Sequence, residues 1–184
     1  MEKQTELRPK MRALALEWLI DVHYKFKLLP ETLFLTVNYM DRFLSTNNIS
    51  KKDLQLVAIC ALQIASKYED IYPPERADFE YVCDNAYSKD QIILCEKAIW
   101  AGLNFEMSPH TSNRFLERFC QIMGADDLVK SYAQYLIECC LVEYSLIKWK
   151  PSLVAASCLY LAKKILKYSE PWSKTIQDET GFTT

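Results

Sequence analysis

Apolar residues recur at helical spacing along most of the chain, and short polar or proline-containing stretches separate the segments that carry them. This three-to-four-residue period is typical of α-helices with a buried face. Prolines and N-cap residues mark where successive helices begin. The pattern predicts an all-α fold. The expected helices span residues 9–27, 30–45, 51–70, 75–85, 89–103, 109–123, 126–147, 151–167 and 173–179.

Two of these segments resemble each other. Residues 56–67 read LVAICALQIASK, residues 153–164 read LVAASCLYLAKK, and six of the twelve positions are identical. Two alanine-rich buried helices could match by composition alone. Each segment is also the third predicted helix of its half, however, which favours a duplicated bundle. We therefore expect two tandem five-helix bundles, over 7–105 and 106–184, the second lacking its last helix because the chain is a fragment.

Composition and charge argue against several classes of fold and function. Three glycines are few for a protein built on strands and tight turns. The net charge of −2 gives no support for a basic nucleic-acid-binding face. No stretch approaches the 18 or so uninterrupted apolar residues of a membrane span, and the first residues have no apolar core typical of a signal peptide.

The sequence carries no pattern typical of an enzyme or a metal site. The seven cysteines contain no C-x-x-C pair, so we expect reduced, mostly buried thiols and no metal or cofactor. Phosphate-binding loops and hydrolase or metalloprotease motifs are absent. The two histidines, His23 and His110, fall in different halves. We therefore expect a protein that is not an enzyme.

The first predicted helix has two apolar faces. One face carries Met11, Leu14, Ala15, Trp18 and Val22, with Glu17 and Asp21 beside it, and the other carries Leu16, Leu19, Ile20 and Phe26. Periodicity alone favours burial on both sides. The alternative is an exposed tryptophan groove with an acidic rim, suited to a basic-apolar peptide.

Lys67 and Glu96 are charges next to apolar runs on two different predicted helices. Each could be an ordinary surface charge, the commonest state of lysine and glutamate. If they lie together and half-buried, they could instead offer a donor and an acceptor to the backbone of a partner.

Several longer strings resemble the cyclin family, and most closely its mitotic A/B-type members. Residues 11–14 with Trp18 and Leu19 resemble the opening of the cyclin box, and residues 38–44 resemble its second helix. Residues 54–57 and 65–75 are similar to the third helix and the loop after it. Leu103-Asn104-Phe105 and Thr180-Gly181-Phe182 match later landmarks. The resemblance covers residues 7–184.

The resemblance implies roles for individual residues. The family's signature falls on Arg12, Asp41, Leu56, Lys67 and Glu96, and the counterparts of Arg12 and Asp41 pair within the first repeat. The counterparts of Lys67 and Glu96 bind the backbone of the partner kinase's mobile regulatory helix and the loop before it. The resemblance adds to this kinase-binding surface Tyr68, Glu69, Ile71, Lys89, Trp100, Phe105 and Met107.

The resemblance also implies a peptide-docking patch on the first helix, which favours the exposed alternative there. Its members would be Met11, Leu14, Glu17, Trp18, Asp21, Leu54 and Gln55. In this family the patch docks R-x-L substrate and inhibitor motifs, with Glu17 and Asp21 facing the arginine. Ala15 and Asp21 depart from the family's usual leucine and glutamate, and both changes would weaken docking.

The implied function is that of a regulatory subunit. We expect a chain that allosterically activates a cyclin-dependent Ser/Thr kinase, recruits R-x-L substrates, controls the cell cycle and resides in nucleus and cytoplasm. Membranes and nucleic acids are not expected partners. A cyclin-fold transcription module that binds DNA or peptides is the alternative, and a generic helical-repeat scaffold is a further one.

Overall fold

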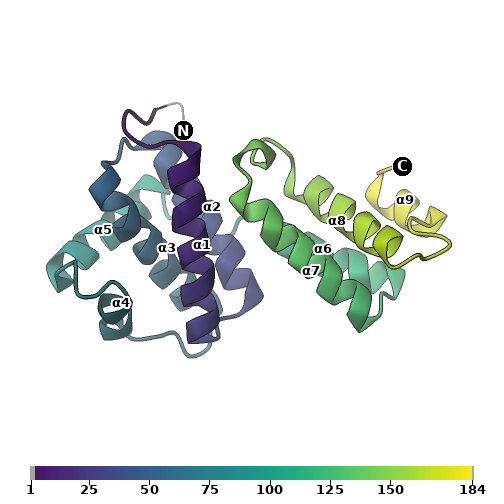
Figure 1. Cartoon of the computed structure of the whole chain (residues 1–184), viewed down its shortest axis with the longest axis horizontal. Helices are drawn as coiled ribbons and strands as arrows, with labels where there is room; N and C mark the ends of the chain where they lie inside the picture. Colours follow the sequence, from purple (N-terminus) through teal and green to yellow (C-terminus); the bar gives the residue numbers. More distant parts are fainter. Residues whose placement is uncertain (1–2, 184) are drawn as a thin grey trace. The chain divides into compact units, whose positions relative to one another are not determined.

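The predicted helices form and are distributed over two units, which divide between Pro109 and His110 (Figure 1). The computed structural model describes residues 3–183, and within that range it contains helices and no β-strand. The first unit contains α1 (Pro9–Phe26), α2 (Pro30–Thr46), η1 (Lys51–Asp53), α3 (Leu54–Glu69), α4 (Arg76–Val82) and α5 (Lys89–Gly102). The second contains α6 (Ser112–Met123), α7 (Asp127–Val142), η2 (Tyr144–Leu146), α8 (Pro151–Ile165) and α9 (Lys174–Thr180).

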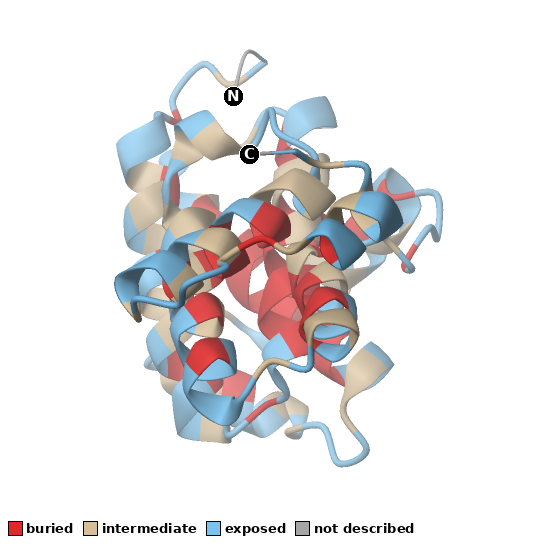
Figure 2. Cartoon of the chain, turned by 90° about the vertical axis from the view of Figure 1, so that its right-hand side faces the viewer, coloured by how far each residue is buried: buried red, intermediate tan, exposed pale blue. Residues whose placement is uncertain are grey.

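Helix α3 is the centre of the first unit. It contacts α1, α2, α4 and α5, and every residue from Leu56 to Ser66 is buried. Ala58, Ala61 and Ala65 are fully buried. Because alanine has a small side chain, these positions let neighbouring helices approach closely. Figure 2 shows that buried positions lie inside the helical packing, whereas the connecting loops are mostly exposed.

Helices α1 and α2 are joined by a buried ion pair. The Arg12 side chain is 1% exposed, and its Nε and Nη2 donate to the two carboxylate oxygens of Asp41, each at 2.7 Å. Leu56, the third residue of the structural signature, is buried in α3. A buried guanidinium is tolerated only when its charge is paired and hydrogen-bonded, so this contact fixes how α1 sits on α2.

Helix α8 occupies the corresponding position in the second unit. It packs against α6 and α7, and α9 packs against α6. Its buried residues are small or aliphatic: Ala155, Ala156, Cys158, Leu159 and Ala162. The described part of this unit therefore contains four α-helices around a shared core.

Three predicted helix boundaries are wrong by three residues or more, and one of them is the end of α4, which lies at Val82 and not at residue 85. Helix α6 does not begin at Pro109, because the Thr111 hydroxyl accepts a hydrogen bond from the Arg114 amide at 3.2 Å and caps the helix there. Helix α7 does not continue to residue 147. The backbone becomes extended at Glu143. The Glu143 carboxylate accepts a hydrogen bond from the Ser145 amide and so caps the start of η2. The boundaries of α6 and α7 were decided by local side-chain caps.

Candidate functional site

The side chains of Lys67 and Glu96 meet on the surface of the first unit. Lys67 lies in the last turn of α3 and Glu96 lies midway along α5. The Lys67 ammonium is 2.5 Å from Glu96 Oε1, and the two side chains are 38% and 13% exposed. Packing of α5 on α3 brings the charges together across 29 positions of sequence. Glu96 is thus half-buried, whereas Lys67 is exposed, and both remain accessible to a partner.

Arg76 completes the cluster, and sequence reasoning missed it. It is the first residue of α4, and its Nη2 lies 3.5 Å from Glu96 Oε2, so each carboxylate oxygen faces one cation. The Arg76 Nε is buried without a hydrogen-bond partner among the described residues. Nothing in the sequence near Arg76 indicates this contact, because it depends on how the loop after α3 turns.

Exposed aromatic and aliphatic side chains lie at the C-terminal ends of the same two helices, α3 and α5. Tyr68 and Ile71, at the end of α3 and just after it, are 47% and 84% exposed. Phe105 is 70% exposed after α5, and its ring stacks on half-buried Trp100 with centroids 5.7 Å apart. Large exposed apolar residues of this kind are typical of protein–protein contact sites.

Hydrogen bonds tie these two segments together. The Tyr68 hydroxyl and the Ser108 hydroxyl are 2.5 Å apart and join the end of α3 to the connector after α5. Asp70 accepts from the Leu29 amide at 2.9 Å and from the Thr32 hydroxyl at 2.6 Å, which anchors the start of the loop after α3 to α2. Tyr72, two residues later in that loop, is 91% exposed and was not predicted as a contact residue.

The three remaining predicted kinase-contact residues differ from one another in exposure and position. Met107 is buried, so its side chain is not a surface contact in this structure, and its carbonyl accepts a hydrogen bond from the Tyr39 hydroxyl at 2.7 Å. Lys89 is exposed at the start of α5, seven residues and therefore about 10 Å before Glu96. Glu69 is half-buried in the last turn of α3.

Helix α1 is not fully buried on both of its predicted apolar faces. The core-facing residues are Arg12, Leu16, Leu19, Val22 and His23. Leu14 is 57% exposed, Glu17 and Asp21 are exposed, and Met11 and Trp18 are half-buried. Full burial of both faces, favoured by periodicity, is therefore wrong at Leu14, whereas Val22 of the same predicted face is buried and Trp18 is only partly exposed.

Leu54 does not belong to an exposed patch. It is the first residue of α3 and is 7% exposed, because the turn of η1 brings the start of α3 against the core of the first unit. Gln55 beside it is half-buried, and its side-chain oxygen accepts a hydrogen bond from the Tyr87 hydroxyl at 3.3 Å. The predicted docking patch thus loses one apolar contact.

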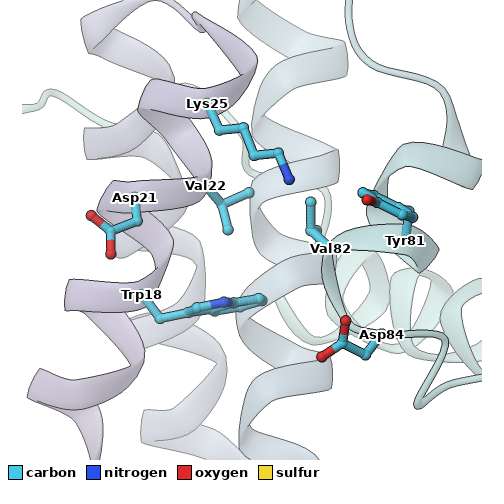
Figure 3. A pocket seen from close by; sticks show the side chains of 7 residues that line it. All are labelled: Trp18, Asp21, Val22, Lys25, Tyr81, Val82 and Asp84. Carbon is cyan, nitrogen blue, oxygen red and sulfur yellow. The ribbon is translucent and has the colours of Figure 1, made fainter.

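A pocket of about 280 Å³ lies beside Trp18 instead, between α1 and the end of α4. Figure 3 shows its lining side chains, which come from α1 and, more than 50 positions later in the sequence, from the end of α4 and the turn after it. They are Trp18, Asp21, Val22, Lys25, Tyr81, Val82 and Asp84. Trp18, Asp21 and Val22 come from the apolar face and acidic rim that the sequence shows. The α4 residues became neighbours only through folding.

Two thiol pairs lie between neighbouring helices. Cys140 Sγ on α7 is 3.7 Å from Cys158 Sγ on α8, and this hydrogen bond lowers the pKa of Cys140 to about 7. A hydrogen bond from Cys60 likewise lowers the pKa of Cys95. Burial raises the pKa of Cys83 to about 11.

Within residues 3–183 no group of three or more metal-ligating side chains comes together, and none of the helices there has the length and apolarity that a membrane crossing requires.

The sequence matches two known domain families. Residues 1–108 match the family described as "Cyclin, N-terminal domain", and residues 110–184 match "Cyclin, C-terminal domain". The chain is 45% identical over 183 residues to cyclin-B1-5 of Oryza sativa subsp. japonica, covering all of this chain and 41% of that protein. It is 43% identical over 177 residues to G2/mitotic-specific cyclin-B2 of Oryzias luzonensis, covering 96% and 46%. The chain thus spans less than half the length of these relatives.

Solved structures share the fold. A viral cyclin from herpesvirus saimiri superposes with a TM-score of 0.89 at 23% identity, over 98% of this chain and 81% of that one. A chain of the yeast RNA Pol II CTD kinase CTDK-1 complex gives a TM-score of 0.71 at 13% identity, over 96% and 61%. With both domain families matched and B-type relatives identical at more than two positions in five, the chain belongs to the cyclin family.

Proposed function

We propose that this chain is a regulatory subunit that binds a cyclin-dependent Ser/Thr protein kinase and activates it without catalysing a reaction itself. The single observation that carries the proposal is the cluster of exposed Lys67 with half-buried Glu96 and Arg76, next to exposed Tyr68 and Ile71. A regulatory role is supported by membership of the cyclin family and by B-type relatives. One fold relative comes from the CTDK-1 kinase complex.

The chemistry of the cluster suits a backbone-binding role. A lysine ammonium has three donors, and a carboxylate accepts several hydrogen bonds. Each group can therefore form further hydrogen bonds after the two have bonded to each other. A helix end in a partner exposes unpaired amides and carbonyls. Lys67 can donate to such a carbonyl while Glu96 accepts from an amide. Arg76 then keeps the Glu96 charge paired during the exchange.

Activation follows from differential binding. A regulatory subunit that binds the active placement of a mobile kinase helix better than the inactive one shifts that equilibrium by its difference in affinity. The helix carries the glutamate that must pair with the ATP-site lysine of the kinase. In this proposal the catalytic residues, ATP and magnesium all belong to the partner.

The same proposal includes recruitment of R-x-L substrates by α1. Exposed Leu14 and half-buried Trp18 offer an apolar contact, and Glu17 and Asp21 offer carboxylates for the arginine. Bidentate pairing of arginine with a carboxylate is among the stronger polar contacts available at a surface. Ala15, smaller than the leucine usual in the family, and buried Leu54 leave this apolar surface limited.

A kinase assay tests the proposal. The purified chain is mixed with a panel of cyclin-dependent kinases, and phosphorylation of a histone-type substrate is compared with that of each kinase alone. We expect strong stimulation of at least one kinase. Stimulation of none by a chain that shows cooperative thermal unfolding would contradict the proposed function.

A further inference from the structure

The pocket between α1 and α4 carries opposite charges at its two ends. In Figure 3 the Lys25 ammonium reaches across one end, and the Asp84 carboxylate lies at the other end, near the Trp18 ring. The Val22 and Val82 side chains lie between them. Asp21 adds a second carboxylate on α1. An apolar floor with a cation at one end and the Asp84 carboxylate at the other is complementary to a peptide that carries both signs of charge.

Local contacts hold the two charged ends in place. Lys25 lies one helical turn after Asp21, yet its Nζ lies over the Tyr81 ring, 5.2 Å from the centroid, which directs it across the pocket toward α4. Asp84 has a left-handed φ of 52°, and its amide donates to the Tyr81 carbonyl at 3.0 Å in the tight turn after α4. Neither charge depends on a long flexible loop.

We propose that this pocket selects peptides that carry an acidic residue beside the basic-apolar docking motif, with Lys25 as the specificity-determining residue. The inference rests on the docking role proposed above. Asp84 would pair with the basic residue, Trp18, Val22 and Val82 would contact the apolar one, and Lys25 would pair with the acidic one. A pocket of about 280 Å³ lies just below the usual size range of ligand sites, which suits a short peptide segment.

Fluorescence polarisation with synthetic peptides tests this. Each labelled peptide contains one R-x-L core and a single Glu, Ala or Lys, placed in turn at each flanking position. For at least one position we expect the Glu peptide to bind about two- to five-fold tighter than the Ala peptide at low salt, as for exposed ion pairs, and the Lys peptide to bind more weakly.

Charge reversal supplies the specific control. Lys25→Glu should invert the preference, so that the Lys peptide binds best. Lys164→Glu makes the same change of net charge in the second unit and also removes a lysine from a tyrosine ring, 5.4 Å from the Tyr160 centroid. It should leave the preference unchanged. Thermal unfolding of both variants checks that each is folded.

The outcomes separate the two proposals. If R-x-L peptides bind but Glu and Lys flanks bind equally at every position, docking stands and the role of Lys25 is wrong. An equal effect of Lys25→Glu and Lys164→Glu would also overturn that role. If no R-x-L peptide binds, the docking role and this inference both fail, whereas kinase activation is unaffected.

A second, independent site lies in the second unit. Cys140 on α7 and Cys158 on α8 face each other with sulfurs 3.7 Å apart, Cys158 is buried and Cys140 is half-buried. The Cys158 thiol donates a hydrogen bond that holds the pKa of Cys140 at about 7, so a large share of Cys140 is thiolate near neutral pH. The thiolate is the form that reacts with oxidants.

We infer that Cys140 and Cys158 are a site of disulfide formation by hydroperoxides. The Cys140 thiolate attacks one peroxide oxygen, the O–O bond breaks, and a sulfenic acid and water form once a proton is taken up. The Cys158 sulfur then attacks the Cys140 sulfur, the S–S bond forms and a second water leaves with the Cys158 proton. Two thiols are oxidised and one hydrogen peroxide is reduced. The sulfurs must approach to about 2.05 Å, a shift that side-chain rotation and small helix movements can supply.

Peptide mapping after hydrogen peroxide treatment tests this. Trypsin should release residues 131–148 joined to residues 149–163, and a thiol reductant should separate them. Cys139→Ser, which removes the exposed neighbour, should keep the cross-link, and Cys140→Ser should abolish it. A link that survives Cys140→Ser, or no link in the Cys139→Ser protein, would overturn the inference.

Discussion

Helices α3 and α8 have closely related sequences and very different surroundings. Both contain the pattern Leu-Val-Ala at the start and an Ala and a Lys near the end. In α3 almost every residue is buried, whereas α8 exposes Leu161 at 45% and Ile165 at 49%. The counterpart of Leu161, 97 positions earlier, is Ile64, which has no exposed surface.

The difference lies in the neighbours. Helix α3 is contacted by α1, α2, α4 and α5, whereas α8 packs mainly on α6 and α7. Cys60 on α3 lies against α5, with its sulfur 3.7 Å from the Ile92 carbonyl, while its counterpart on α8, Ser157, is exposed. Equivalent residues therefore contribute to the core in one unit and to the surface in the other. This comparison teaches that burial is set by which helices cover a face.

The largest expected difference between α3 and α8 is the change in unfolding free energy when the matched residues Ile64 and Leu161 are each truncated to alanine. Ile64→Ala removes fully buried methyl groups and should cost about 2–5 kcal/mol in the unfolding free energy of the first unit. Leu161→Ala trims an exposed side chain and should change stability by no more than about 0.5 kcal/mol. Urea unfolding followed by circular dichroism measures both.

The two variants also check each other. Equal costs for Ile64→Ala and Leu161→Ala would show that α8 is covered as fully as α3 in solution. Because the chain has two units, the midpoint of each transition is the appropriate readout when unfolding is not a single step.

Much of the fold could be predicted from the sequence. Helical periodicity, capping prolines and the match between 56–67 and 153–164 indicated two all-helical halves with a central third helix. These features are local or repeated, so a single sequence contains them. Boundaries at Thr111 and Glu143 were missed because a side-chain cap there outcompeted neighbouring candidates.

The candidate sites were only partly predictable. The sequence indicated Lys67 and Glu96 as unusual charges, and the packing of α5 on α3 brings them together. Arg76, Lys25 and Asp84 gave no comparable pattern, because their positions depend on how α4 and its flanking turns pack. Leu54 was misplaced on the surface for the same reason, since burial at a helix start depends on the preceding turn.

One tryptophan in each unit, half-buried Trp18 and exposed Trp149, sharpens the comparison between the units. Trp18→Ala should spare kinase activation on short peptides and weaken phosphorylation of R-x-L substrates by about ten- to thirty-fold in kcat/KM, as for an aromatic interface anchor. Trp149→Ala removes a 49% exposed tryptophan from the second unit and should affect neither substrate. Equal losses on both substrate types for Trp18→Ala would assign Trp18 to the core.

Thiol reactivity gives the smallest contrast. In Cys139→Ser protein, the rate of Cys140 alkylation by iodoacetamide should rise as pH passes through about 7, below the ordinary cysteine range of about 8.5, because alkylation requires the thiolate. Cys158→Ala removes the hydrogen bond that lowers the Cys140 pKa and should move the inflection to higher pH. An unchanged inflection in that variant would contradict the assigned cause.

The most direct test of the central claim is a kinase-binding titration of Lys67→Ala beside Lys164→Ala, its counterpart in the second repeat. Lys67 is half-exposed and paired in the free chain, so its loss should cost the fold only about 0–1 kcal/mol. At an interface with kinase it would leave partner groups buried and unpaired, which should weaken binding by about 30- to 5000-fold. Lys164→Ala should change neither quantity. If Lys67→Ala lowers the melting temperature sharply while the folded fraction binds the kinase normally, the Lys67–Glu96 pair is structural and the proposed binding surface is wrong.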